Sequence, residues 1–106
     1  MEKRKPHYNL DSIKSAFADP DDLGKMTGSA LKGARKLRLS DEDIVNVIQS
    51  LGMRDFHKSM TSLRDHTIWQ DVYLPSYQGV ELYVKFTRDE DDQYYLLISF
   101  KKSEQE

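Results

Sequence analysis

VELYVKFT, residues 80–87, is the stretch of sequence that decides the fold. Its side chains alternate between two sets, with Val80, Leu82, Val84 and Phe86 in one and Glu81, Tyr83, Lys85 and Thr87 in the other. A period of two is typical of a β-strand that packs one face on a core and exposes the other. Tyr83 and Lys85 are therefore expected to share the exposed face.

Further strands are predicted on both sides of this one. β-branched and aromatic residues dominate residues 56–61, 67–73 and 94–101. The polar run Arg88–Asp92 has the length of a hairpin loop, so the last two strands should be antiparallel neighbours. Residues 75–79 are expected to form a bend between the second and third strands.

Ahead of the strands, three stretches repeat apolar residues at helical spacing. The first begins at Leu10 and ends before Pro20, and the third runs from Ser40 to the stop signal Gly52. Thr27 or Ser29 can cap the second. In this second helix Ala30, Leu31, Ala34 and Leu37 are expected to face inward and Lys32, Arg35, Lys36 and Arg38 outward. The order indicates an α+β fold, with three N-terminal helices packed on a mostly antiparallel sheet of three to four strands or more.

Length and composition limit the class of protein. A chain of 106 residues suits a single domain, 1–106, and 32% of its residues are charged. It has no apolar run near the roughly 20 residues of a membrane span, no secretory signal and no cysteine, which favours the cytoplasm. The net charge is −2, but basic residues gather between positions 25 and 38 and acidic ones between 89 and 92.

The segment DFHKSMTSLRDHTIWQDVYLP, residues 55–75, carries most of the chemical information. Its FxKSMT and DHTIWQDVY motifs, and the Pro two residues after that Tyr, resemble the MqsR toxins, the motility quorum-sensing regulator family of ribonuclease toxins. Weaker similarity extends to EKRxPH at the start, YxK around Tyr83 and SFK near the end. The resemblance implies a RelE-like domain that cuts mRNA without the ribosome, at short GC-containing sites such as GCU. It also implies a cognate MqsA-type antitoxin partner, whose zinc belongs to the antitoxin.

Cleavage of RNA through its own 2′-hydroxyl needs a base, an acid and cations or donors for the phosphorane-like transition state, and no cofactor. The strand half of the chain offers His57, Lys58, His66, Gln70, Tyr83, Lys85 and Lys101. The three histidines are too dispersed for a local metal-ligand pair, so no metal site is expected. A non-catalytic RNA-binding or partner-binding module is the alternative, with the lysines as solvated strand residues.

The family resemblance selects four catalytic candidates, Lys58, Gln70, Tyr83 and Lys101. His57, Lys85 and Arg54 are added as RNA-binding candidates. Lysines would stabilise phosphate charge, and Gln70 can only position groups by hydrogen bonding. Tyr83 could donate to the phosphate, or move protons if the two lysines lower its pKa. The best-known family member has a Tyr at the position of His57, which leaves the general base open.

Overall fold

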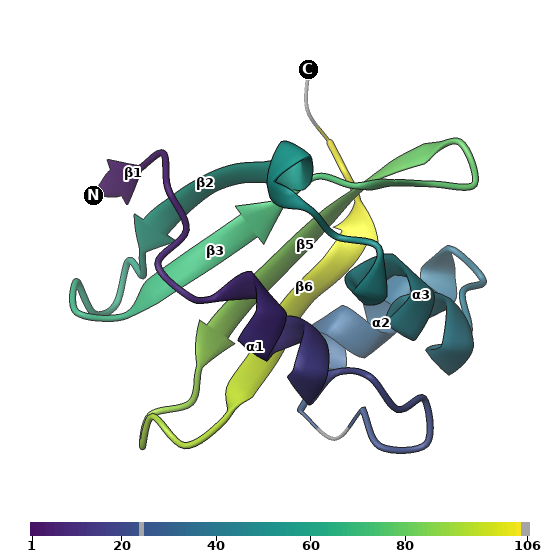
Figure 1. Ribbon diagram of the computed structural model, residues 1–106, viewed down its shortest axis with the longest axis horizontal. Helices are drawn as coiled ribbons and strands as arrows, with labels where there is room; N and C mark the ends of the chain where they lie inside the picture. Colours follow the sequence, from purple (N-terminus) through teal and green to yellow (C-terminus); the bar gives the residue numbers. More distant parts are fainter. Residues whose placement is uncertain (24, 105–106) are drawn as a thin grey trace.

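The computed structural model describes residues 1–23 and 25–104, with helices on one face of an antiparallel sheet (Figure 1). Its helices are α1 (Leu10–Ala16), α2 (Gly28–Lys36), α3 (Asp41–Gln49) and the short 3-10 turn η1 (Met53–Asp55). Its strands are β1 (Glu2–Lys3), β2 (Phe56–Thr61), β3 (Trp69–Tyr73), β4 (Ser76–Tyr77), β5 (Val80–Arg88) and β6 (Tyr95–Lys102). No helix among these residues is long and apolar enough to cross a membrane.

The starts of α2 and α3 follow the predicted capping chemistry, whereas α3 ends at Gln49, three residues before the predicted stop at Gly52. Thr27, and not Ser29, caps α2, because its hydroxyl accepts from the amide of Ala30. Ser40 and Asp43 form a reciprocal capping box at the start of α3. The inward position expected of Leu31 is wrong, since its side chain is 41% exposed. The buried side chains of α2 are those of Ala30 and Ala34, and together with Gly33 these small residues let the helix approach the sheet closely.

The predicted RelE-like layout, with three N-terminal helices packed on a sheet of three to four strands or more, is wrong, because the sheet is larger and one of its strands precedes the helices. Within the described residues the sheet has six strands, in the order β1-β2-β3-β5-β4, with β6 on the other side of β5. β1 precedes all the helices, and β4 occupies part of the expected bend at residues 75–79. Gln78 and Gly79 both have positive φ, as a two-residue hairpin turn requires. The α+β class itself agrees with the structure, and the predicted pairing of the last two strands is confirmed.

The core lies between the helices and one face of β5 and β6. Figure 1 shows the helices gathered around this half of the sheet, with β1 and β2 at the far edge. Val84, Phe86, Leu97 and Phe100 point into the core together with Ile44 and Ile48 of α3. Tyr83 and Lys85 occupy the alternate positions of β5, so they lie on the opposite, open face.

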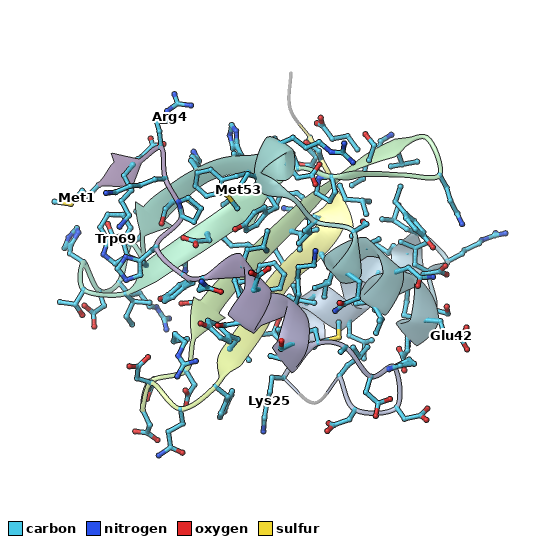
Figure 2. The ribbon with its side chains drawn as sticks, in the orientation of Figure 1. Met1, Arg4, Lys25, Glu42, Met53 and Trp69 are labelled. Atoms are coloured by element: carbon cyan, nitrogen blue, oxygen red, sulfur yellow. The ribbon has the colours of Figure 1, made fainter. Side chains whose placement is uncertain are left out.

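The N-terminal segment covers the part of the sheet that the helices leave bare. The buried carboxylate of Asp71 in β3 accepts from the backbone amides of His7 and Tyr8 and from the hydroxyl of Ser59. His7 stacks on Trp69 with 5.2 Å between ring centroids, and Trp69 lies at the β1 end of the molecule (Figure 2). These contacts fix β1 beside β2.

Candidate active site

Strand register places most of the candidate side chains in rows on the open face of the sheet. One row pairs Tyr83 of β5 with Lys101 of β6. The next runs across four strands through Lys58, Val72, Lys85 and Ser99, and a third pairs Met60 with Gln70. Because side chains alternate between faces, the residues of all three rows point to the same side.

A β-bulge adjusts the start of β2 beside this face. The register shifts between Phe56 and Lys58, which makes His57 the extra residue of the bulge. Phe56 stays on the core side, where its ring lies 5.4 Å from that of Tyr73. The shift brings His57 and Lys58 together at the end of the sheet where Tyr83 and Lys101 lie.

These four side chains line one shallow pocket. Its volume is about 340 Å³, and its lining residues are His57, Lys58, Tyr83, Lys101, Ser103 and Glu104. They come from β2, β5, β6 and the residues that follow β6, which are far apart in the sequence. The pocket combines an imidazole, a phenol and two ammonium groups in a space open to solvent.

Tyr83 lies among lysines but does not ionise more easily because of them. The ammonium of Lys101 lies 5.4 Å from the centre of the Tyr83 ring, and that of Lys85 lies 5.8 Å from it. Partial burial raises the pKa of Tyr83 above its ordinary value. The condition under which Tyr83 would act as a base, a pKa lowered by the two lysines, is therefore not met, and Tyr83 stays protonated near neutral pH. Its hydroxyl is suited to donate a hydrogen bond or a proton.

Lys85 lies in the middle of a cationic cluster. Burial is the main cause that lowers the pKa of Lys85, and the positive charges of Lys101 and Lys58 lower it further. Glu2 of β1 offsets part of this charge, since its carboxylate lies 3.5 Å from the ammonium of Lys58. An anion bound in the pocket would relieve the remaining repulsion, so the cluster favours a phosphate ligand.

The other sequence candidates lie farther from the pocket. Gln70 is on the same face, but four residues along the sheet from the level of Tyr83, which is roughly 13 Å at the rise of a strand. Arg54 is exposed on η1, outside the pocket lining. His66 lies on the exposed loop between β2 and β3. Among residues 1–23 and 25–104, no group of three or more histidine or acidic side chains is placed to hold a metal ion.

Sequence reasoning missed Glu2, Ser103 and Glu104 as parts of this site. Glu2 reaches Lys58 because β1 pairs with β2 opposite Ser59 and Met60. A strand of two residues is too short to show the alternation of side chains that marks a strand, so this contact could not be predicted from the sequence. Ser103 and Glu104 follow the last strand, where a strand pattern gives no direction for side chains.

The fold and pocket together define a small α+β protein with an open pocket in which two ammonium groups lie beside an imidazole and a phenol. The family described as "Motility quorum-sensing regulator, toxin of MqsA" matches residues 5–102, and the chain belongs to this family. The chain is also 42% identical over 104 residues to the mRNA interferase toxin MqsR of Escherichia coli (strain K12). That similarity spans 96% of this chain and 99% of the relative.

Proposed function

We propose that residues 1–106 form one toxin domain that acts in the cytoplasm as an endoribonuclease of the mRNA interferase kind. It cuts mRNA without the ribosome and without a metal ion, at short GC-containing sites such as GCU. The observation that carries the proposal is the meeting of Lys58, Tyr83 and Lys101 in one open pocket. The name of the 42% identical relative, an mRNA interferase toxin, supports the same activity.

The proposed reaction is transfer of the phosphodiester to the neighbouring 2′-oxygen. A base removes the proton of the 2′-hydroxyl, this oxygen bonds to phosphorus, and the 5′-oxygen leaves with a proton from an acid. Lys58, Lys85 and Lys101 stabilise the extra negative charge on the phosphoryl oxygens. Tyr83 donates to the phosphate or to the leaving oxygen, in keeping with its raised pKa. His57 supplies the imidazole, the side chain that most often moves protons in enzymes.

Residues outside the pocket have binding roles in this proposal. Gln70 lies along the same face, where its amide can position a sugar or base of the bound RNA. Arg54 is exposed near the start of β2 and contacts phosphates away from the cut. The family description names the group as toxin of MqsA, which supports neutralisation by a cognate MqsA-type antitoxin.

End mapping of cleaved RNA tests this function. Purified protein is incubated with GCU-containing RNA in excess EDTA, and the expected products carry 2′,3′-cyclic phosphate and 5′-hydroxyl ends. Lys58→Ala and Tyr83→Phe should keep the fold and lower the cleavage rate at least about 100-fold each. Tyr94→Phe, an exposed tyrosine on the β5–β6 hairpin, is the matched control and should cut normally. Tight RNA binding without any cut would refute the enzyme and favour a binding module.

A further inference from the structure

A second hollow lies beside the candidate active site, between α2 and β6. It has a volume of about 450 Å³ and continues from the site, because Lys101 and Glu104 line both hollows. From this point we call it the α2–β6 groove. Its walls include Lys32, Gly33 and Lys36 of α2 and Lys102 of β6.

The groove is strongly cationic although the whole chain carries a net charge of −2. Lys32 and Lys36 are four residues apart, so they project from the same side of α2. Within the described part of the chain, no ion pair or hydrogen bond engages the ammonium group of Lys32, Lys36 or Lys102. Glu104 is the acidic residue among the described lining residues. The positive charge of the groove is therefore available to a ligand.

The packing of α2 on β6 fixes the two walls of the groove relative to each other. Gly33 lies so close to the backbone carbonyl of Phe100 that a Cβ atom at position 33 would overlap it. At the start of the helix, the amide of Thr27 donates to the carbonyl of Leu97 and its hydroxyl donates to that of Ile98. α2 is thus fixed on the edge of β6 at two points.

We propose that the α2–β6 groove binds the sugar-phosphate backbone of single-stranded RNA on one side of the cleavage point. The groove begins at Lys101, so a strand whose scissile phosphate lies between Lys101 and Tyr83 can continue directly along α2. Lys32, Lys36 and Lys102 contact its phosphates without reading base identity. This inference rests on the proposed function for the position of the cut and adds where the flanking RNA runs.

Binding of uncleavable RNA tests the groove separately from catalysis. The probes are a short 2′-O-methyl oligonucleotide that contains GCU and two longer versions, extended on the 5′ side or on the 3′ side. For the natural protein, one of the two extensions is expected to tighten binding. Lys32→Glu combined with Lys36→Glu should remove that gain, about tenfold in Kd, and lower the salt slope for the extended RNA by about 1.4. Binding of the short RNA should change little.

The control changes the same amount of charge at the opposite edge of the sheet. Arg4→Glu combined with Lys5→Glu should keep the gain from the extension, since Arg4 points away from the molecule near β1 (Figure 2). Lys32→Gln combined with Lys36→Gln should reduce the gain from the extension in the same direction as the charge-reversed pair, but by a smaller amount. This neutral pair guards against a loss of binding that comes from misfolding of the charge-reversed variant.

Persistence of the extension gain in both α2 double variants would refute the groove, as would its absence in the natural protein. Cleavage of unmodified short RNA, measured in parallel, reports on the proposed function. A protein that cuts the short RNA but gains nothing from either extension keeps the function and loses the groove. A protein that shows the extension gain but cuts nothing keeps the groove and loses the enzyme.

Discussion

At the scale of single residues, Lys85 shows how the candidate site conflicts with stability. Its ammonium is half-buried on β5 and faces the charges of Lys58 and Lys101, all of which lower its pKa. A basic group whose pKa is lower in the folded state than in the unfolded state reduces the free energy of unfolding. The full reduction applies at every pH below the folded-state pKa. The penalty falls as pH rises toward the ordinary pKa of lysine, because the unfolded chain then loses the proton as well.

Lys85→Met should therefore stabilise the protein and damage its activity. We expect Tm at pH 7 to rise by about 2–5 °C, with a smaller gain as pH approaches 10. RNA cleavage should fall at least about tenfold, because a phosphate ligand loses one of its cations. Thermal unfolding across pH and cleavage rates are the measurements. The exposed Lys5→Met is the control, and an equal gain in Tm there would rule out the burial argument.

Tyr73 illustrates a polar atom that the fold tolerates. Its ring is fully buried against Phe56 and Phe86, and its hydroxyl has no hydrogen-bond partner among the described residues. Burial is the first cause that raises its pKa, and the nearby charge of Asp71 is the second. The hydroxyl thus loses water on folding without compensation.

Tyr73→Phe is expected to match the natural protein in stability or exceed it by about 1 kcal/mol. Tyr8→Phe is the matched comparison, since the Tyr8 hydroxyl donates to the carbonyl of Trp69 at 2.8 Å. Its loss should cost about 1 kcal/mol. Urea unfolding of both variants measures the difference, and a larger loss for Tyr73→Phe would contradict this account of the core.

At the scale of elements, α2 is the helix whose position most affects the proposed RNA path. Its inner side presents only alanines and Gly33, which brings it into contact with the backbone of β6. Residues 25–27 extend this contact, since Leu97 exchanges hydrogen bonds with Lys25 and Thr27. The helix therefore covers the outer edge of β6 as well as forming one wall of the α2–β6 groove.

Gly33→Ala should push α2 away from β6 and destabilise the protein by about 2–3 kcal/mol, because backbone cannot yield as a side chain can. Gly28→Ala is the control in the same helix, where a Cβ meets no atom within 4 Å. That change should be neutral or slightly stabilising. Equal stability of the two variants by urea unfolding would mean that the contact with Phe100 is not tight.

The elements also show what sequence patterns can and cannot give. α3 was predictable because a capping signal and an apolar stripe coincide, and β5 because its alternation is uninterrupted. β1 and β4 have two residues each and form only because longer strands offer them edges. The wrong position of Leu31 has a similar origin, since periodicity marks a face but not how close the neighbouring strand lies.

At the scale of the whole molecule, Asp71 of β3 links the N-terminal segment to the middle of the sheet. Its carboxylate lies in the middle of the sheet and holds the amides of His7 and Tyr8, which carry the N-terminal segment across β3. The same segment continues into β1, where Glu2 reaches Lys58. A core carboxylate on one face of the sheet thus helps to order a charge on the other.

Asp71→Ala should free the N-terminal segment and cost about 3 kcal/mol of unfolding free energy, since two backbone amides and a hydroxyl lose an ionised acceptor. Hydrogen exchange of the His7 and Tyr8 amides should accelerate more than exchange in α3. Asp65→Ala is the control, because the Asp65 carboxylate accepts from the amide and hydroxyl of Thr67 in an exposed loop, far in the sequence from the N-terminal segment. Unchanged exchange at His7 and Tyr8 would show that other contacts hold the segment.

The candidate site was only partly accessible to sequence reasoning, for a reason that concerns the whole molecule. Alternation along β5 predicted that Tyr83 and Lys85 share a face, and the structure agrees. Their distance from Lys58 and Lys101 depends on register and on the bulge at His57, which local patterns do not determine. The catalytic and RNA-binding roles of these residues remain predictions.

The borders of the sheet bear on how the molecule behaves in a crowded cell. At one edge of the sheet, residues 25–27 and α2 cover β6. At the other edge, β2 contains a bulge, and β1 pairs with only two of its described residues. β4 offers just two positions. A foreign extended peptide would find few consecutive unpaired amides and carbonyls to join, so self-association through backbone pairing is disfavoured. A partner that binds at these borders would therefore depend on side-chain contacts, and its affinity should respond to surface substitutions.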